Sequence, residues 1–192
     1  MPDFREVTEF IKDTFGYIVV FAVMLFIFTF IIAIAPIAGN SMNPTLSDGD
    51  FVVVSKFSYL FSSIKRDDVV IFKDSEKKKY VKRVIGLPGE SIDHLDGFLY
   101  INDEPYKETL LDAKKTNNFM FEDICSKEKC PDGVIPEGKY LVLGDNRIDS
   151  KDSRDPSIGL VDEEEIFGKI LFRLWPFSDF GKVKWKKIRF FP

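Results

Sequence analysis

The feature that most constrains this chain is an uncharged apolar run near its N-terminus. Residues 15–38 contain no charged side chain, and the next charged residue is Asp48. A helix of this length spans roughly 36 Å, which is enough to cross the hydrocarbon core of a bilayer with some tilt. A buried core helix is the alternative, but the length and the all-round hydrophobicity favour a transmembrane anchor. We therefore predict a short tail over 1–14, a transmembrane helix over 15–38 and a polar body over 39–192.

A cleavable signal peptide is an alternative interpretation of the same apolar run. The segment Ala33–Ala35 has the small-x-small form of a cleavage site. Pro36 follows directly, and a proline without an N–H and with a locked φ fits an extended protease site badly. The run is also longer than a normal signal-peptide core, so we expect a retained anchor. Arg5 and Lys12 precede it, whereas the first base after it is Lys56, which favours a cytoplasmic N-terminus and an extracytoplasmic body.

The body is predicted to be mostly β. Runs of β-branched and aromatic residues, separated by Gly, Pro and Asp, recur at 51–54, 69–72, 80–85, 98–101, 140–143 and 166–174. Such runs are typical of an antiparallel sheet or partial barrel rather than of βαβ units. Residues 103–135 are more polar and less patterned, and we expect them to form a small inserted excursion.

Composition excludes several classes of function. The net charge of -4, with both signs interspersed, argues against a nucleic-acid partner. Two cysteines and one histidine cannot form a four-ligand zinc site, and we expect neither a metal nor a cofactor. Cys125 and Cys130 are either free thiols or, if the body lies outside the cytoplasm, a disulfide. Closing so short a loop would contribute about 2 kcal/mol.

A candidate nucleophile lies where the apolar run meets the body. Ser41 is flanked by small and polar residues and followed by a proline-stiffened turn. The single histidine, His94, lies in a turn-like stretch, and a lone histidine is more often structural than catalytic. A lysine can replace histidine as the base if burial keeps its amine neutral. Lys82 lies inside the apolar strand pattern of 80–85, although a structural or surface lysine is the default interpretation there.

Four sequence blocks carry a resemblance to a known family. In order, they are S-M-x-P-T-L at 41–46, G-D at 49–50, Y-x-K-R-x-x-G-x-P-G-E at 80–90 and G-D-N-R-x-x-S-x-D-S-R at 144–154. With the anchor before them and the F-R-L-W-P segment at 172–176 after them, they span most of the chain. Together these blocks resemble bacterial type I signal peptidase.

The resemblance implies a membrane-anchored Ser-Lys endopeptidase that removes signal peptides from exported preproteins. It implies a mostly-β body on the outer side of the cytoplasmic membrane, with preproteins and membrane lipid as partners. Ser41 matches the nucleophile and Lys82 the general base, while Ser150 matches the serine that hydrogen-bonds the lysine amine. Four further positions match residues that brace or support the site: Asp145, Asn146, Asp152 and Arg154.

Substrate selection is expected from shallow apolar pockets that accept small residues one and three positions before the cut. Ile37, Met42 and Val81 are candidate walls, and an extended substrate would pair with the strand at Tyr80–Lys82. The Ser41 N–H is one expected oxyanion donor. The position two residues earlier is Gly39, which lacks a hydroxyl, so the second donor is either backbone or unidentified.

Other functions are also compared. One is a specialised relative that cuts a single pilin, conjugation or archaeal-type substrate. A self-cleaving LexA-type repressor is disfavoured because this chain begins with a membrane span. A third is an inactive anchored β-domain that binds exported chains, which would not need Ser41, Lys82 and Ser150 together. The basic, aromatic stretch 181–192 is read either as a final strand or as a surface that touches anionic lipid.

Overall fold

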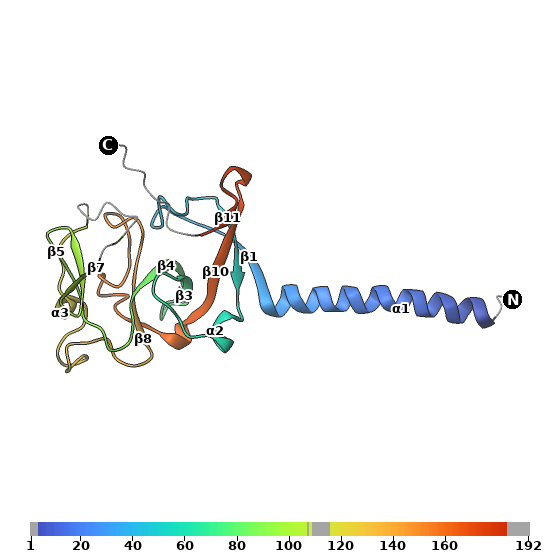
Figure 1. Cartoon of the computed structure of the whole chain (residues 1–192), viewed down its shortest axis with the longest axis horizontal. Coiled ribbons are helices and arrows are strands. Elements are labelled where there is room, and N and C mark those ends of the chain that lie inside the picture. Colours follow the sequence, from blue (N-terminus) through green and yellow to red (C-terminus); the bar gives the residue numbers. More distant parts are fainter. Residues whose placement is uncertain (1–3, 107, 109–115, 184–192) are drawn as a thin grey trace.

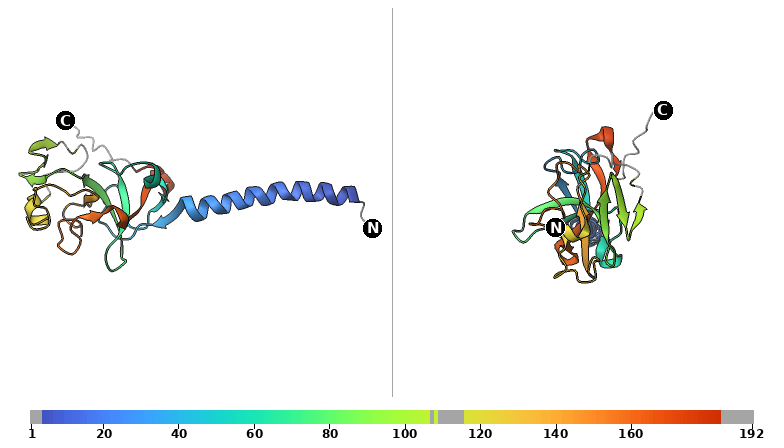
Figure 2. Two further views of the ribbon diagram at one scale, coloured as in Figure 1. Left: turned by 90° about the horizontal axis from the view of Figure 1, so that it is seen from below. Right: turned by 90° about the vertical axis from the view of Figure 1, so that its left-hand side faces the viewer.

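A long helix and a β-rich body make up the computed structural model of the chain, which describes residues 4–106, 108 and 116–183. The helix projects from one end of the body (Figure 1). A small sheet lies at the opposite end, as the views of Figures 1 and 2 agree. The expected fold class, a mostly antiparallel β body preceded by one apolar helix, is confirmed for these residues.

The helix consists of α1 (Phe4–Phe26) and a π-helical turn, η1 (Ile27–Ile31). Residues Ile11–Ile31 are long and apolar enough to cross a membrane. The predicted helix over 15–38 was wrong at its C-terminal end, because β1 (Ile32–Pro36) forms a strand instead. β1 pairs with β2 in register from Ile32–Ser55 to Pro36–Phe51, so its backbone groups are satisfied by a neighbouring strand. The assignment of a tail, an anchor and a body stays a prediction.

The remaining elements follow β1 in chain order. They are β2 (Phe51–Ser55), α2 (Ser58–Phe61), β3 (Val69–Lys73), β4 (Lys79–Gly86), β5 (Ile92–Leu95), β6 (Phe98–Ile101), β7 (Glu104–Tyr106), α3 (Phe121–Ile124), β8 (Lys139–Leu143), β9 (Val161–Asp162), η3 (Glu163–Glu165), β10 (Ile166–Trp175), η4 (Phe177–Asp179) and β11 (Gly181–Lys182).

The large sheet is antiparallel, with the strand order β1-β2-β10-β3-β4-β8-β9 and with β11 paired to β10. Five of its strands match the predicted apolar runs: β2, β3, β4, β8 and β10. The strand β1 was not predicted, because it lies within the membrane-length apolar segment. Register shifts occur in β10 and β4, and such bulges bend a sheet. Residues 184–192, most of the predicted terminal surface, lie outside the described residues.

Alternation along the strands gives the sheet two apolar faces. Val52, Val54 and Ile71 belong to one buried cluster, while Val70 and Phe72 belong to the other. Successive side chains of a strand point to opposite faces. Strands that are apolar at every position, such as Val69–Phe72, are therefore covered on both sides.

The second sheet, β5-β6-β7, builds a smaller core with the segment around α3. The predicted excursion began at residue 103, but this unit begins with β5, because β5, β6 and β7 form one meander. Residues 107 and 109–115 of the predicted excursion lie outside the described residues. Cys125 and Cys130 form a disulfide within this core, which settles the choice between free thiols and a bond.

Gly86, at the end of β4, packs against the smaller core where no side chain fits. A Cβ at this position would lie 2.4 Å from Ile135 Cδ1 and 2.9 Å from Leu141 Cβ. We expect Gly86→Ala to lower the free energy of unfolding by about 1–3 kcal/mol through overpacking. Chemical denaturation in detergent measures this loss. Gly16→Ala is the matched control, because nothing lies within 4 Å of a Cβ there; equal effects of the two changes would contradict the prediction.

Candidate active site

Ser41 lies in a turn within the segment 37–50, and hydrogen bonds between the two ends of this segment close the turn. The Ile37 N–H donates to the Asp50 carbonyl at 2.8 Å, and the Gly49 N–H donates to the Ile37 carbonyl at 3.0 Å. The Asp50 carboxylate is buried and accepts from Arg173 Nη1 of β10 at 2.7 Å. The turn that presents Ser41 is therefore fixed to the middle of the large sheet.

Lys82 reaches Ser41 from strand β4. It lies in β4 opposite Val70 of β3, and only 2% of its surface is exposed. Its Nζ forms a 2.7 Å hydrogen bond with Ser41 Oγ. The structure thus brings together the predicted nucleophile and the predicted base, which are 41 residues apart in sequence.

Burial gives this lysine an unusual acidity. The pKa of Lys82 is lowered from 10.5 to about 8, chiefly because burial removes the ammonium from water; the carboxylates of Asp152 and Asp145 oppose this shift, and the Arg154 guanidinium adds to it. At pH 7, one unit below this pKa, about a tenth of the amine is therefore neutral, against far less than a thousandth for a lysine of ordinary pKa. A neutral amine can accept the proton of a hydroxyl, whereas an ammonium cannot.

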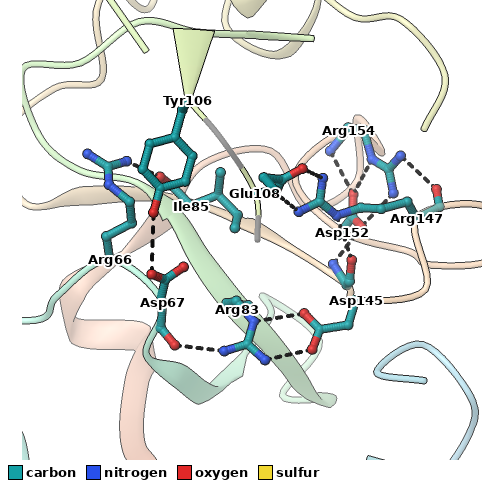
Figure 3. Close-up of polar contacts among 11 residues, drawn as sticks. Arg66, Asp67, Arg83, Ile85, Tyr106, Glu108, Asp145, Arg147, Asp152 and Arg154 are labelled. Carbon is teal, nitrogen blue, oxygen red and sulfur yellow. Dashed lines mark hydrogen bonds and ion pairs between the residues drawn. The ribbon is translucent and has the colours of Figure 1, made fainter. Parts of the chain in front are cut away.

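Asp145 and Asn146 lie directly behind the serine turn. Asp145 forms a bidentate ion pair with Arg83, with distances of 2.8 and 2.6 Å, and both side chains are fully buried (Figure 3). The Asn146 N–H donates to the Ser41 carbonyl at 3.0 Å, and Asn146 Nδ2 donates to the Asn40 carbonyl at 3.1 Å. The loop thereby holds the backbone of the candidate nucleophile from behind.

Asp152 and Arg154 brace the same loop. Arg154 donates twice to the Asp152 carboxylate, each at 2.8 Å, and the Gly144 N–H donates to Asp152 Oδ2 at 2.9 Å. Burial by itself would raise the pKa of Asp152, but the hydrogen bonds and charge of Arg154 lower it overall. Asp152 is thus held as a carboxylate that ties the two ends of the loop together.

Ser150 lies beside the dyad without the expected contact. Its hydroxyl is buried, and a Cβ at Gly144 would come within 2.1 Å of its Oγ and 2.5 Å of the Ser41 carbonyl oxygen. Within the described residues, Ser150 Oγ makes no hydrogen bond to Lys82 Nζ. Its orienting role stays a prediction, supported only by its place next to Gly144.

An apolar groove of about 450 Å³ opens beside Ser41 and Lys82. The four residues predicted to contact substrate all line it: Ile37, Met42, Tyr80 and Val81. Residues of β1, Ala33 to Pro36, form its other side. Since three strands separate β1 from β4 in the sheet order, the sheet must curl for both to line one groove.

Sequence reasoning missed the partners that hold these residues. Arg83 and Arg173 were visible within the quoted blocks but received no role, because their carboxylate partners are distant in sequence. The β1 wall of the groove was assigned to the membrane helix. Among the described residues, no group of three or more His, Cys, Asp or Glu side chains is placed to hold a metal ion.

A serine and a buried lysine in hydrogen-bond contact, beside an apolar groove on an antiparallel sheet, define a hydrolase of the protease class. Comparison with known proteins narrows this class. The signal peptidase family, peptidase S26, matches residues 7–175, and the chain belongs to this family.

Two relatives in sequence agree with the family assignment. A signal peptidase IB of Staphylococcus aureus (strain Mu50) is 41% identical over 180 residues, which cover 90% of this chain and 93% of the relative. A signal peptidase I of Bacillus caldolyticus is 43% identical over 153 residues, covering 76% of this chain and 80% of the relative. The crystal structure of a signal peptidase I from Enterococcus faecalis V583 aligns with a TM-score of 0.48 and 33% identity, covering 56% of this chain and 97% of that chain.

The buried lysine should reduce stability. With a pKa of about 8 folded and 10.5 unfolded, Lys82 binds more protons in the unfolded chain between these values, so its cost is full below pH 8 and disappears above pH 10.5. We expect Lys82→Met to raise the free energy of unfolding by roughly 1–3 kcal/mol at pH 7. The gain should shrink towards pH 10.

Denaturant unfolding at both pH values checks this difference. Lys151→Met, which removes an exposed lysine, is the matched control and should change stability little at either pH. A destabilised Lys82→Met protein, or a gain that does not depend on pH, would contradict the interpretation of a neutral buried amine.

Proposed function

We propose that this signal peptidase uses Ser41 as the nucleophile and Lys82 as the general base to cut signal peptides from exported preproteins. The observation that carries the proposal is the 2.7 Å contact between Lys82 Nζ and Ser41 Oγ, made by a lysine that is almost entirely buried. Contact distance and lowered pKa are the two properties that an amine base requires.

The mechanism follows from these positions. Neutral Lys82 takes the proton of the Ser41 hydroxyl as Oγ attacks the scissile carbonyl, and a tetrahedral intermediate forms. The resulting ammonium gives its proton to the leaving amine, and the acyl-enzyme remains. Lys82, neutral again, accepts a proton from water as the water oxygen attacks the ester carbonyl. When the bond to Ser41 Oγ breaks, the Lys82 ammonium returns this proton to Oγ, which releases the cleaved signal peptide and restores both groups.

The oxyanion of the intermediate needs fixed donors. Within the described residues, the Ser41 N–H donates to no acceptor, so it is available as one donor to the oxyanion. The Gly39 N–H donates to Asp48 Oδ1 at 2.7 Å and is therefore already engaged. The second donor stays unassigned.

The groove suggests how substrate binds. β8 pairs with β4 only from Arg83 onward, so the part of β4 at Tyr80–Lys82 has a free edge facing the groove. β1 is the terminal strand of the large sheet, and its outer edge also borders the groove. An extended peptide that lies between them would pair by β-addition, and the apolar walls favour small residues at positions -1 and -3.

The remaining parts of the proposal concern the membrane. α1 and η1 would anchor the chain, with the body on the extracytoplasmic side of the cytoplasmic membrane. The Cys125–Cys130 disulfide supports this side, because disulfides persist mainly outside the reducing cytoplasm. β1 begins directly after the helix, so the groove would lie near the lipid surface from which the substrate's apolar segment emerges.

Cleavage of a preprotein with an Ala-x-Ala site by detergent-solubilised enzyme tests the dyad. Wild type is expected to cut after the second alanine, and Ser41→Ala and Lys82→Met should each lower kcat/KM at least ~10³-fold, since each removes an essential reacting group. Lys129→Met, which removes an exposed lysine outside the 144–154 loop, controls for the loss of a lysine elsewhere. Retained cleavage by Lys82→Met would place the base elsewhere. If folded wild type binds but cuts no preprotein, the binding-domain or single-substrate alternative is favoured.

The pH dependence gives a second test. Because only the neutral amine accepts a proton, kcat/KM should rise about tenfold per pH unit below a midpoint near the Lys82 pKa of about 8, and then level off. Initial rates between pH 5 and 10 measure this limb. A midpoint near 6.5 would instead indicate a histidine base, and His94 is the single histidine of the chain.

A further inference from the structure

A buried ion pair that the proposed mechanism does not use lies behind the loop of residues 144–154. The Arg147 guanidinium contacts both oxygens of the Glu108 carboxylate, one of them at 3.1 Å (Figure 3). The two side chains are only 3% and 1% exposed. Burying two charges is costly unless they are well paired, so the contact holds its two segments firmly together.

Arg147 transmits this contact to the active site. Its Nε donates to the Gly144 carbonyl at 3.1 Å, and its own carbonyl accepts from Arg154 Nη1 at 2.8 Å. Gly144 packs so closely against Ser150 and the Ser41 carbonyl that not even a Cβ would fit. A shift of Arg147 would therefore be felt at Ser41 through one intervening residue.

Glu108 comes from outside the catalytic sheet. It follows β7, the last strand of the small sheet, by two residues. Tyr106, at the end of β7, places its hydroxyl 3.5 Å from Asp67 Oδ2, and the Asp67 carbonyl accepts from Arg83 Nη1 at 2.8 Å. The end of β7 thus contacts the catalytic loop along two routes, through Arg147 and through the Arg83–Asp145 pair (Figure 3).

We propose that Glu108 is a positioning residue of the proteolytic reaction, which acts through Arg147 to hold the 144–150 loop against Ser41 and Lys82. The small sheet is then a brace for the active site and not merely an appended unit. This inference rests on the proposed Ser41–Lys82 chemistry. Its consequence is that a change at Glu108 alters turnover although the residue touches neither substrate nor dyad.

Glu108→Gln removes the negative charge and keeps the shape. We expect kcat to fall about 10–100-fold with KM within about threefold, because small misplacements of reacting groups slow the chemical step more than they weaken binding. The charged groups that act on Lys82 are Asp152, Asp145 and Arg154, and all of them lie in the loop of residues 144–154. If the loop loosens, water reaches the amine, the pKa of Lys82 rises towards 10.5, and the midpoint of the pH–rate limb moves to higher pH.

The assay uses the full chain in detergent, an Ala-x-Ala preprotein and rates normalised to folded protein by circular dichroism. Glu104→Gln, at an exposed position of β7 four residues before Glu108, is the matched control and should retain wild-type kcat and pH midpoint. Glu108→Asp keeps the charge and should recover part of the lost kcat. A lack of cleavage by wild type would contradict the proposed function, whereas active wild type with an unchanged Glu108→Gln overturns only the inference.

Further outcomes decide whether Glu108 positions the loop or only stabilises the fold. If Glu108→Gln loses rate only in proportion to lost folded protein, with the pH midpoint unmoved, Glu108 stabilises the fold and the inference is wrong. If neither Glu108→Gln nor Glu108→Asp folds, the same conclusion follows. A reduced kcat and a raised midpoint in folded Glu108→Gln, absent from Glu104→Gln, support a positioning role.

Discussion

The burial of one amine is the constraint on which the rest of this active site depends. Lys82 must be desolvated to be neutral, yet two carboxylates, Asp145 and Asp152, belong to the loop around it and would restore its charge. Each of them is paired with an arginine, Arg83 or Arg154. The pairs let the loop be cross-linked by strong, charge-assisted hydrogen bonds while limiting the negative potential at the amine.

The curl of the large sheet forms the groove beside this site, because it brings β1 and β4 to the two sides of one groove. A flat sheet of this strand order would place β1 and β4 three strands apart, and no peptide could reach both. The register shifts in β10 and β4 bend the sheet, so that two strand edges face one groove. Unpaired strand edges are normally hazards, so two edges left open beside a serine and a lysine are consistent with the proposed transient pairing of an extended substrate.

The sequence predicted most of the strands and the candidate catalytic residues, but few of the ion pairs that link them. Runs of Val, Ile and Phe marked five strands of the large sheet because both faces of that sheet are buried. β1 could not be seen, because an apolar strand that follows an apolar helix shows no change in composition. Ser41 and Lys82 carried motif signals, whereas Glu108 lies in a polar stretch with no pattern. Its pairing with Arg147, 39 residues away, depends on the fold alone.

These ion pairs determine how the candidate site responds to substitutions. The groove walls are apolar side chains, and swaps of similar volume at such positions are generally tolerated. The charges behind the loop are different, because removing one partner of a buried pair leaves the other uncompensated at a cost of several kcal/mol. Three arginines each pair with a carboxylate and also donate to a backbone carbonyl: Arg83 to that of Asp67, Arg147 to that of Gly144 and Arg154 to that of Arg147. If the proposed dyad and groove are correct, we therefore expect substrate preference to vary at the groove without disturbing Ser41 and Lys82, whose geometry should depend on the ion pairs behind them.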